Sequence, residues 1–452
     1  MKKIALSLAS VLVATAFAPE VSALPLFARQ TGRACNSCHY QHFPLLTAVG
    51  QDFKSSGFTQ VNGKGKFKSE DLSITDNLNL GVYTTTYFQT QAHGTTDGVT
   101  NTAAVDGNKW GVPGNGGELS LFLGGRVSDF AGFLAEAGLG GGGAGAPTSS
   151  GGVVGPAKLV MLFPVGDSRV GTVIFTSTDQ GVAYSFENLN TGAVAVHKMM
   201  GNGGPNGQHV NAAYAAQYLG TATAATGLAF VATGGMGFVN VAAYEAAGND
   251  ATKGANNLNL TYIRVASTMN FGDWEAGFGI QNFGGKSTVT APTGAQYYAP
   301  KATIVDGQLQ GSLGTMPVGF YVGIGSAAAS TATEANPFNT AMDTAGGKAK
   351  TTFNFAAEFG VLPHTTVQAG LRLAKNGVDS GLAADGVTPS GTSQTDNALM
   401  LGVTYQLAQN ILLSFHHTQQ SGSAWNAQMI GGVLNSEPVG KDANTLLLQT
   451  SF

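Results

Sequence analysis

The chain has 452 residues, of which 43% are hydrophobic and only 11% are charged, and its formal net charge is −4. Ordinary soluble domains carry about 25% charged residues, so this composition indicates a surface that faces lipid over much of its area. No basic face is evident, which argues against nucleic-acid binding. The 65 glycines follow no collagen period and lie inside alternating segments, so the composition does not indicate disorder.

The first 23 residues have the features of an export signal. Two lysines precede an apolar stretch over residues 4–18, and a small-residue cleavage site follows at residues 21–23. This order is typical of a signal peptide and predicts a mature chain that begins at Leu24. Beyond it the sequence has no run of about 18 apolar residues, so no membrane-spanning helix is expected.

Cys35 and Cys38 are the only cysteines of the chain, and His39 follows them directly. Two thiols at this spacing with an adjacent imidazole form the c-type haem attachment pattern, in which each cysteine adds to one vinyl group and the histidine ligates iron. A zinc site would need about two more ligands at suitable spacing, and none follows. A disulfide or redox dithiol would leave His39 unexplained. The motif therefore predicts one covalent haem c, held by Cys35 and Cys38, with His39 as the proximal ligand of the iron.

From about residue 74 onward, polar and apolar residues alternate with a period of two. In residues 77–91 one parity carries Leu80, Val82 and Phe88, while the other carries Asn79 and Gln89. The same alternation returns near residues 119–127, 353–359, 367–373 and 399–406, and in the final residues 445–452. Segments of about ten residues with one apolar and one polar face are typical of tilted transmembrane strands.

The connections between these segments alternate between short and long. Short ones lie at residues 129–131, 166–168, 271–273, 314–316, 363–365 and 408–410, and long polar stretches separate them. This is the pattern of periplasmic turns and outer loops, and the chain ends on an aromatic residue, Phe452, as outer-membrane barrels do. A soluble β-sandwich or a secreted solenoid would not account for these features together. We therefore predict an all-β fold, a closed antiparallel transmembrane barrel in the bacterial outer membrane with both termini in the periplasm.

The number of strands is set by parity. A raw count gives about seventeen, whereas bacterial barrels close with an even number. The odd strand of this count arises between residues 182 and 245. Either residues 182–190 form an extra strand, which gives about 18, or one segment within residues 209–235 is not a strand, which gives about 16 strands, the number we favour. The strand expected near residues 258–266 mixes its two faces around Arg264, so a β-bulge or a misplaced strand boundary is expected there.

The residues around the haem motif resemble a family. The block consists of residues 27–32, the motif itself, and Phe43, Pro44, Gly50, Phe53, Lys54, Gly57 and Phe58. It is similar to the fused outer-membrane monohaem cytochrome-porins of iron-oxidising bacteria over about residues 25–60, and architecturally beyond. The resemblance implies that an extracellular donor such as ferrous iron is oxidised at the cell surface. Electrons then pass through the haem to a periplasmic c-type cytochrome, which makes the chain at most a ferrous iron:cytochrome c oxidoreductase.

The predicted domains are a signal peptide (1–23), a helical monohaem cytochrome c segment (24–73) and a barrel (74–452). About 50 residues are marginal for folding around a macrocycle without help. A barrel of 16 to 18 strands leaves an aqueous lumen wide enough to hold them as a plug. One haem does not cover a hydrocarbon layer of about 30 Å, so the donor needs access through the outer mouth.

A second iron ligand is not evident beside the motif. If the segment after the motif is helical, His42 shares a face with His39 and does not reach the opposite side of the iron. His416 is expected to point into the lumen near the middle of its strand, and it is the first candidate for the distal ligand. Met400 and His364 are further candidates. Each of the three also suits a wet pore lining without any iron contact.

Three functions from different classes follow from these expectations. The first is an electron conduit across the outer membrane. The second is a diffusion porin in which the haem segment only plugs or gates the pore. The third is a haem enzyme such as a peroxidase, which requires an open distal position. No motif of a hydrolase or a nucleotide-binding protein occurs in the sequence.

Overall fold

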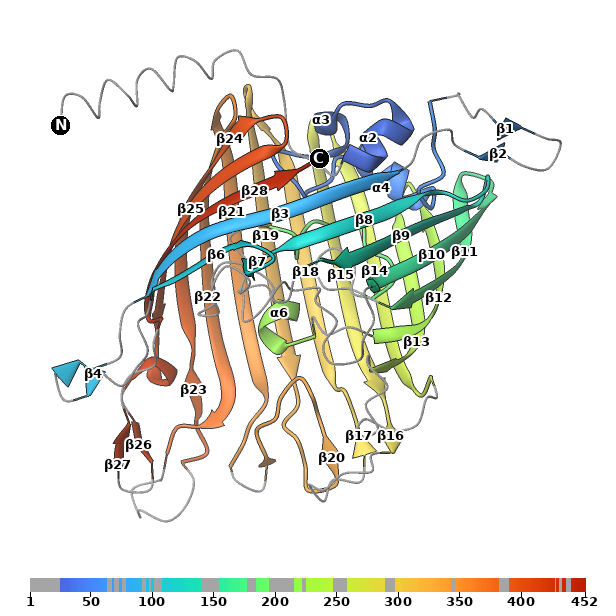
Figure 1. Ribbon diagram of the computed structural model, residues 1–452. Helices are drawn as coiled ribbons and strands as arrows, with labels where there is room; N and C mark the ends of the chain where they lie inside the picture. Colours follow the sequence, from blue (N-terminus) through green and yellow to red (C-terminus); the bar gives the residue numbers. More distant parts are fainter. Residues whose placement is uncertain are drawn as a thin grey trace, which may run out of the picture.

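The computed structural model shows a closed antiparallel β-barrel with short helices at one end and helix α6 in its interior (Figure 1). It describes residues 25–62, 67–68, 73–74, 79–91, 95–96, 99–100, 108–139, 154–176, 184–194, 215–221, 225–246, 258–288, 297–343, 346–381, 390–426, 428–430, 433–435 and 440–452. The predicted signal peptide, residues 1–23, lies outside this set. Among the described helices, none is long and apolar enough to cross a bilayer.

In the described part of the chain the wall has sixteen strands, which confirms the lower of the two expected numbers. They are β3 (Leu80–Gln91), β8 (Leu119–Arg126), β9 (Ala131–Gly138), β10 (Val154–Val165), β11 (Ser168–Thr176), β12 (Ala225–Gly234), β13 (Gly237–Ala246), β14 (Leu260–Phe271), β15 (Trp274–Gly285), β18 (Ala302–Leu313), β19 (Met316–Ala327), β21 (Lys350–Leu362), β22 (Thr365–Asp379), β24 (Asn397–Ala408), β25 (Ile411–Ser421) and β28 (Asp442–Ser451). The last strand, β28, pairs with the first, β3, and this pairing closes the barrel.

Shorter pieces extend or decorate this wall. The pieces β6 (Lys109–Pro113) and β7 (Gly116–Gly117) continue the strand position of β8 beside β3, and β23 (Ser393–Thr395) extends the position of β24 beside β22. The remaining short elements are β1 (Phe67–Lys68), β2 (Ser73–Ile74), β4 (Thr95–Thr96), β5 (Val99–Thr100), β16 (Ser287–Thr288), β17 (Tyr297–Tyr298), β20 (Glu334–Ala335), β26 (Gln428–Ile430), β27 (Val433–Asn435) and the 3₁₀ turn η5 (Ser423–Trp425).

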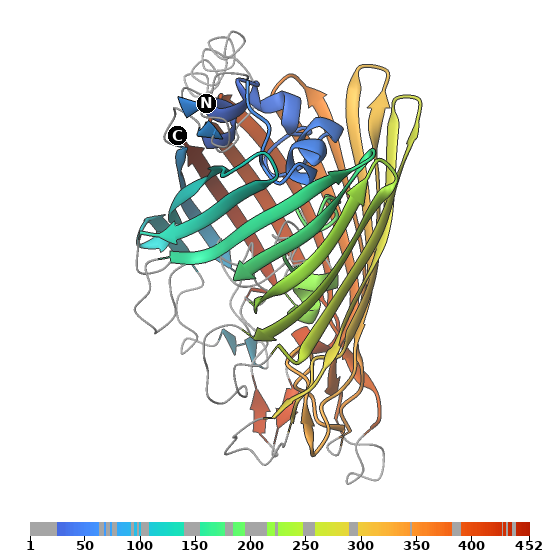
Figure 2. The ribbon, with the colours of Figure 1, turned by 90° about the vertical axis from the view of Figure 1, so that its right-hand side faces the viewer.

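The two ends of the barrel differ in their connections, as predicted. Strands such as β14 and β15, or β18 and β19, are joined by tight turns at one end, which we call the short-turn end, and by long connections at the other. The carboxy-terminal Phe452 lies at the short-turn end, where its backbone exchanges hydrogen bonds with Val82. Helices α2 (Pro25–Thr31), α3 (Cys35–Cys38) and α4 (Ala48–Ser55) lie at the same end (Figure 2).

The outer face of the wall is apolar, and the alternation expected from the sequence is confirmed. On β21, the outward Phe353 and Phe355 are 38% and 39% exposed, whereas the inward Asn354 and Glu358 are fully buried. The strands β22 and β24 repeat this pattern with outward Leu373 and inward Met400. An apolar belt of this kind is suited to contact with lipid.

Two segments between β11 and β12 fold into the barrel, and they explain the break in parity. Residues 184–194 are buried without forming a strand, so the expected extra strand at 182–190 is absent from its described part. Helix α6 (Ala215–Leu219) replaces a strand within the segment 209–235 and is anchored by Tyr218, whose hydroxyl donates to Asp396 at 3.0 Å. Both segments pack against inward apolar side chains of the wall, such as Tyr262 and Phe283.

Of the two explanations expected around Arg264, the β-bulge is wrong, whereas the strand boundary is indeed shifted, because the strand runs from Leu260 to Phe271. Strand β14 pairs in unbroken register with both neighbours, and Tyr262 and Arg264 both point inward. The faces look mixed in the sequence because this part of the lumen is filled by protein. An inward tyrosine therefore packs against residues 184–194, which carry the apolar Tyr184 at a ring distance of 5.2 Å.

Arg264 fastens this inner segment to the wall. Its guanidinium donates to both carboxylate oxygens of Asp306 on β18 at 2.7 and 2.9 Å, and it forms an ion pair with Glu187 at 2.9 Å. All three side chains are buried. Two carboxylates around one guanidinium are costly to bury, and the bidentate geometry offsets that cost.

Asp306→Ala should lower the free energy of unfolding by about 3–5 kcal/mol, because it removes the bidentate partner of a buried guanidinium. Denaturant titration of the refolded barrel in detergent micelles measures this change. The control is Asp273→Ala in the exposed turn between β14 and β15, for which a change within about 0.5 kcal/mol is expected. Equal effects of the two variants would show that the buried cluster contributes nothing to stability.

Candidate functional site

The two cysteines of the motif lie on one turn of helix. Helix α3 spans Cys35–Cys38, so the thiols are three residues apart and share a face. Neither takes part in a disulfide; Cys35 is buried and Cys38 is half-buried. The two thiols thus lie on one face of a single helical turn.

His39 ends the helix and turns its ring back onto the chain. Its backbone N–H still donates to the Cys35 carbonyl at 2.9 Å, but its φ of −112° leaves the helix. Ring atom Nδ1 lies 3.0 Å from the carbonyl oxygen of Leu45. Because a carbonyl only accepts, Nδ1 is the protonated nitrogen, and Nε2 keeps its lone pair. Burial lowers the pKa of His39 to about 4, so the ring is neutral near pH 7, the form that binds metals.

This arrangement fits a haem c. A ligating histidine usually donates its other ring N–H to a carbonyl or carboxylate, and Leu45 supplies that acceptor here. Cys35 and Cys38 would hold the group, and Nε2 of His39 would face the iron. Among the described residues, no cluster of three or more His, Cys, Asp or Glu side chains is arranged to hold a metal ion by itself.

Helix α4 packs closely against this segment through Gly50. A methyl group added at Gly50 would lie 2.2 Å from the carbonyl oxygen of Cys38, so only glycine permits the contact. Thr47 caps the helix, with its hydroxyl accepting from the Gly50 N–H at 3.3 Å. Phe53 on the next turn packs against Phe27 of α2 at a ring distance of 5.0 Å.

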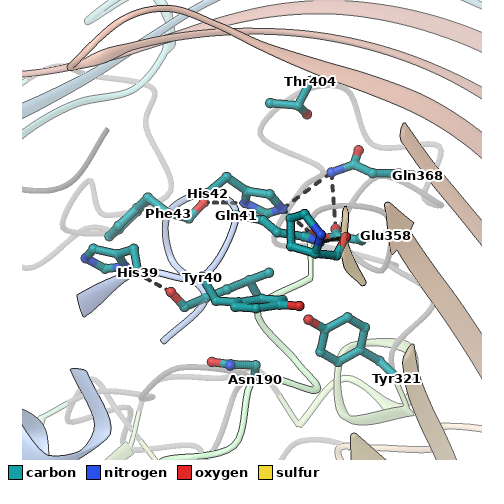
Figure 3. A network of polar contacts seen from close by, with 12 residues as sticks. His39, Tyr40, Gln41, His42, Phe43, Asn190, Tyr321, Glu358, Gln368 and Thr404 are labelled. Atoms are coloured by element: carbon teal, nitrogen blue, oxygen red, sulfur yellow. Dashed lines mark hydrogen bonds and ion pairs between the residues drawn. The ribbon is translucent and has the colours of Figure 1, made fainter. Parts of the chain in front are cut away.

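The segment after His39 differs from the expectation for His42. Residues 39–46 form turns and a bridge, not a helix, so the helical argument against His42 does not apply. His42 is 3% exposed, and its Nε2 lies 2.8 Å from Glu358 of β21. In Figure 3 His42 points toward Glu358 and Gln368, with His39 at the opposite side of the view.

Further contacts attach the same segment to the wall and to residues 184–194. The Tyr40 hydroxyl donates to the carbonyl oxygens of Gly311 and Val318 at 2.5 and 2.9 Å. The side chain of Asn190 pairs with the backbone of Leu46 in both directions, each at 2.8 Å. The alternation over residues 353–359 marked the position of Glu358 as polar, but the sequence gave no signal for the contacts at Gly311 and Val318 or for Asn190, which lies outside any strand.

The three candidates for a distal ligand lie in different places. His416 on β25 is buried and inward, as expected, and its Nε2 lies 2.9 Å from Oε1 of Gln368. Met400 is fully buried in the cluster that contains Leu45. His364 lies in the turn between β21 and β22. Among the described residues, none of the three has a hydrogen bond or ring contact with His39, and distal ligation stays a prediction.

Comparisons with known proteins concern the barrel. The sequence matches no protein-family model and no curated protein. Its structure is similar to the outer-membrane channel DcaP of Acinetobacter baumannii, with 11% identity and a TM-score of 0.49 over 86% of this chain and 100% of that one. It is also similar to OmpT of Vibrio cholerae (11%, TM-score 0.44, 83% and 99%) and to an anion-selective porin of Comamonas acidovorans (13%, TM-score 0.43, 83% and 99%).

Gly50→Ala should loosen α4 from the motif at a cost of about 1–3 kcal/mol, because the added methyl group overlaps the Cys38 carbonyl. In protein refolded without haem, we expect Cys35 to react faster with a maleimide reagent than in the parent protein. Val49→Ala, on an exposed position of the same helix, serves as the control. Unchanged labelling in Gly50→Ala would contradict the close packing of α3 and α4.

Proposed function

We propose that this chain is an outer-membrane electron-transfer protein that passes electrons from an extracellular donor to a periplasmic c-type cytochrome, with one covalent haem c as its redox group. The observation that carries the proposal is the hydrogen bond from His39 to the Leu45 carbonyl, directly after two cysteines that lie on one helical turn and form no disulfide. It leaves Nε2 as the ligating nitrogen in a motif whose spacing already specifies haem attachment.

The bound haem supplies a one-electron couple of iron. The residues of this chain hold, orient and shield it. Cys35 and Cys38 fix its edge, and the Leu45 carbonyl orients the ring of His39. Helix α4 and residues 184–194 cover the segment, and contacts such as that of Asn190 with Leu46 fasten it inside the barrel mouth. Cys38 and His39 are half-buried, which limits solvent access to the redox group, one of the levers on a haem potential.

The apolar belt and the closed sheet support a location in the bacterial outer membrane. In barrels of this class the short turns face the periplasm. The motif and the carboxy terminus would then both lie on the periplasmic side, within reach of a periplasmic cytochrome. The donor is carried over from the resemblance, which implies ferrous iron at the cell surface.

A diffusion porin is the second candidate, and the barrel fold by itself favours it. Sixteen strands enclose a lumen wide enough for an aqueous channel. In this function the segment around residues 25–62 only narrows or gates the pore. One observation argues against a diffusion porin. Residues 184–194 and α6 form an apolar cluster with the wall, and this cluster fills part of the lumen with protein.

Purified mature protein should carry one haem per chain that survives denaturation, and Cys35→Ala with Cys38→Ala should abolish it. The pyridine haemochrome spectrum and haem staining of denaturing gels measure both. In whole cells, ferrous iron should reduce the haem. Reduction by dithionite but not by ferrous iron would remove the donor assignment and leave the electron-transfer role. A chain without covalent haem would contradict the proposal as a whole.

Planar-bilayer recordings separate the two candidates. A diffusion porin gives large open-channel conductance and slow reduction of its haem by surface donors. The electron conduit gives low conductance and rapid reduction. Deletion of residues 25–62 would raise the conductance in either case, so the full chain is the one to record.

His416→Ala tests the first distal candidate. Loss of an axial ligand changes the visible spectrum of a haem, so we expect a shift if His416 ligates the iron. The control is His417→Ala, the next residue of β25, which faces outward and contacts Asn444 at 3.0 Å. Identical spectra for the two variants would remove His416 from the candidates.

A further inference from the structure

A row of polar side chains runs around part of the inner wall at one level. Backbone register places one residue from each of six neighbouring strands side by side, from β21 through β22, β24, β25 and β28 to β3. The members of this polar row are Glu358, Gln368, Gly402, His416, Thr445 and Gln89. All of its side chains are at most 3% exposed.

Hydrogen bonds connect the row. The amide N–H of Gln368 donates to Oε1 of Glu358 at 3.1 Å, and the Oε1 of Gln368 accepts from Nε2 of His416 at 2.9 Å. His416 reaches across β24 because Gly402 has no side chain; a methyl group there would lie 2.3 Å from the imidazole. Gln368, itself held by His416, therefore fixes the orientation of the Glu358 carboxylate.

Among the described residues, His42 is the one member of residues 25–62 that has hydrogen-bond contacts with the row. Nδ1 of His42 lies 2.8 Å from the carbonyl of Phe43, and because a carbonyl only accepts, Nδ1 donates. The contact of Nε2 with Glu358 at 2.8 Å then contains a single shared proton, and both side chains are buried. Removal of either partner leaves the other buried without its charge-assisted hydrogen bond.

This contact differs in kind from the hydrogen bonds by which the neighbouring Tyr40 and Gln41 attach to the wall. Tyr40 and Gln41 donate to backbone carbonyls, at Gly311, Val318 and Pro317. A carbonyl occurs at every residue, so such contacts tolerate a shift of the segment along a strand. Glu358 is the member of the polar row that carries a carboxylate. The contact of His42 with Glu358 therefore fixes the segment at one position along the wall.

We propose that His42 is a positioning residue, which through Glu358 and the polar row fixes where the Cys35–His39 motif sits in the barrel and thereby sets the environment of its redox group. The first part of the proposal, the docking of the Cys35–His39 motif at one place in the barrel, is argued from the contacts of the described residues. Its consequence for the redox group rests on the proposed function.

The test compares His42→Ala, Glu358→Ala, the double variant and Glu358→Gln in the full-length protein purified in detergent. Two quantities are measured, the rate of proteolytic cleavage within residues 25–62 and the midpoint potential of the haem. We expect each alanine variant to be cleaved at least about tenfold faster, since a buried pair has lost one partner. Their midpoint potentials should shift from that of the parent.

The double variant and the conservative variant separate positioning from general destabilisation. Because His42 and Glu358 act as a pair, the double variant should be cleaved no faster than the worse single variant. Glu358→Gln keeps an acceptor for the His42 N–H, so it should restore most of the protection. His417→Ala and Glu245→Ala, which alter outward-parity positions of the wall, should behave as the parent, and heat-modifiable migration on gels confirms that every variant forms a closed barrel.

Cleavage rates and potentials of His42→Ala that equal those of His417→Ala would overturn the inference, and so would additive effects in the double variant. Failure of Glu358→Gln to restore protection would overturn the role of the hydrogen bond. A parent protein without covalent haem would instead contradict the proposed function, while the cleavage rates would still decide the docking step.

Discussion

The pairing of β28 with β3 is the interaction on which the rest of the structure depends. It removes both free edges of the sheet, so every strand of the wall has two neighbours and its backbone groups are satisfied within the protein. Closure also fixes the register around the barrel. Residues far apart in the sequence, such as Glu358 and Gln89, therefore lie at the same level of one inner surface, which no local feature of the chain specifies.

The closed wall encloses two different interiors. Along β10 to β18 many inward side chains are apolar, and they form a core with residues 184–194 and α6. From β21 to β3 the inward side chains include the polar row. The segment with the Cys35–His39 motif contacts both, through Phe53 and Phe58 on one side and His42 on the other. The lumen thus provides the apolar surface that about 50 residues lack on their own.

Local patterns were sufficient to predict most strands and the alternation of turn and loop lengths, because each strand has one face toward the outside and the other toward the interior. They did not settle the number of strands, which the even-number rule left at about 16 or 18. The expected bulge at Arg264 failed because a filled lumen lets an inward tyrosine resemble an outward one. The helix does not continue after His39 because Leu45 and Leu46 turn back to bond His39, so the condition under which His42 would share a face with His39 is not met. The motif marked the site, but Glu358 and Asn190 approach it only through tertiary structure.

The polar row also constrains how His416 would ligate a metal. Its Nε2 is engaged by Gln368, and Nδ1 has no hydrogen-bond partner among the described residues. With Gln368 accepting, the proton is on Nε2 and the lone pair is on Nδ1. Ligation through Nε2 requires that the bond to Gln368 break, which removes the support behind Glu358 and weakens the docking of His42. Distal ligation through Nε2 and an intact row therefore exclude each other, whereas ligation through Nδ1 leaves the row whole.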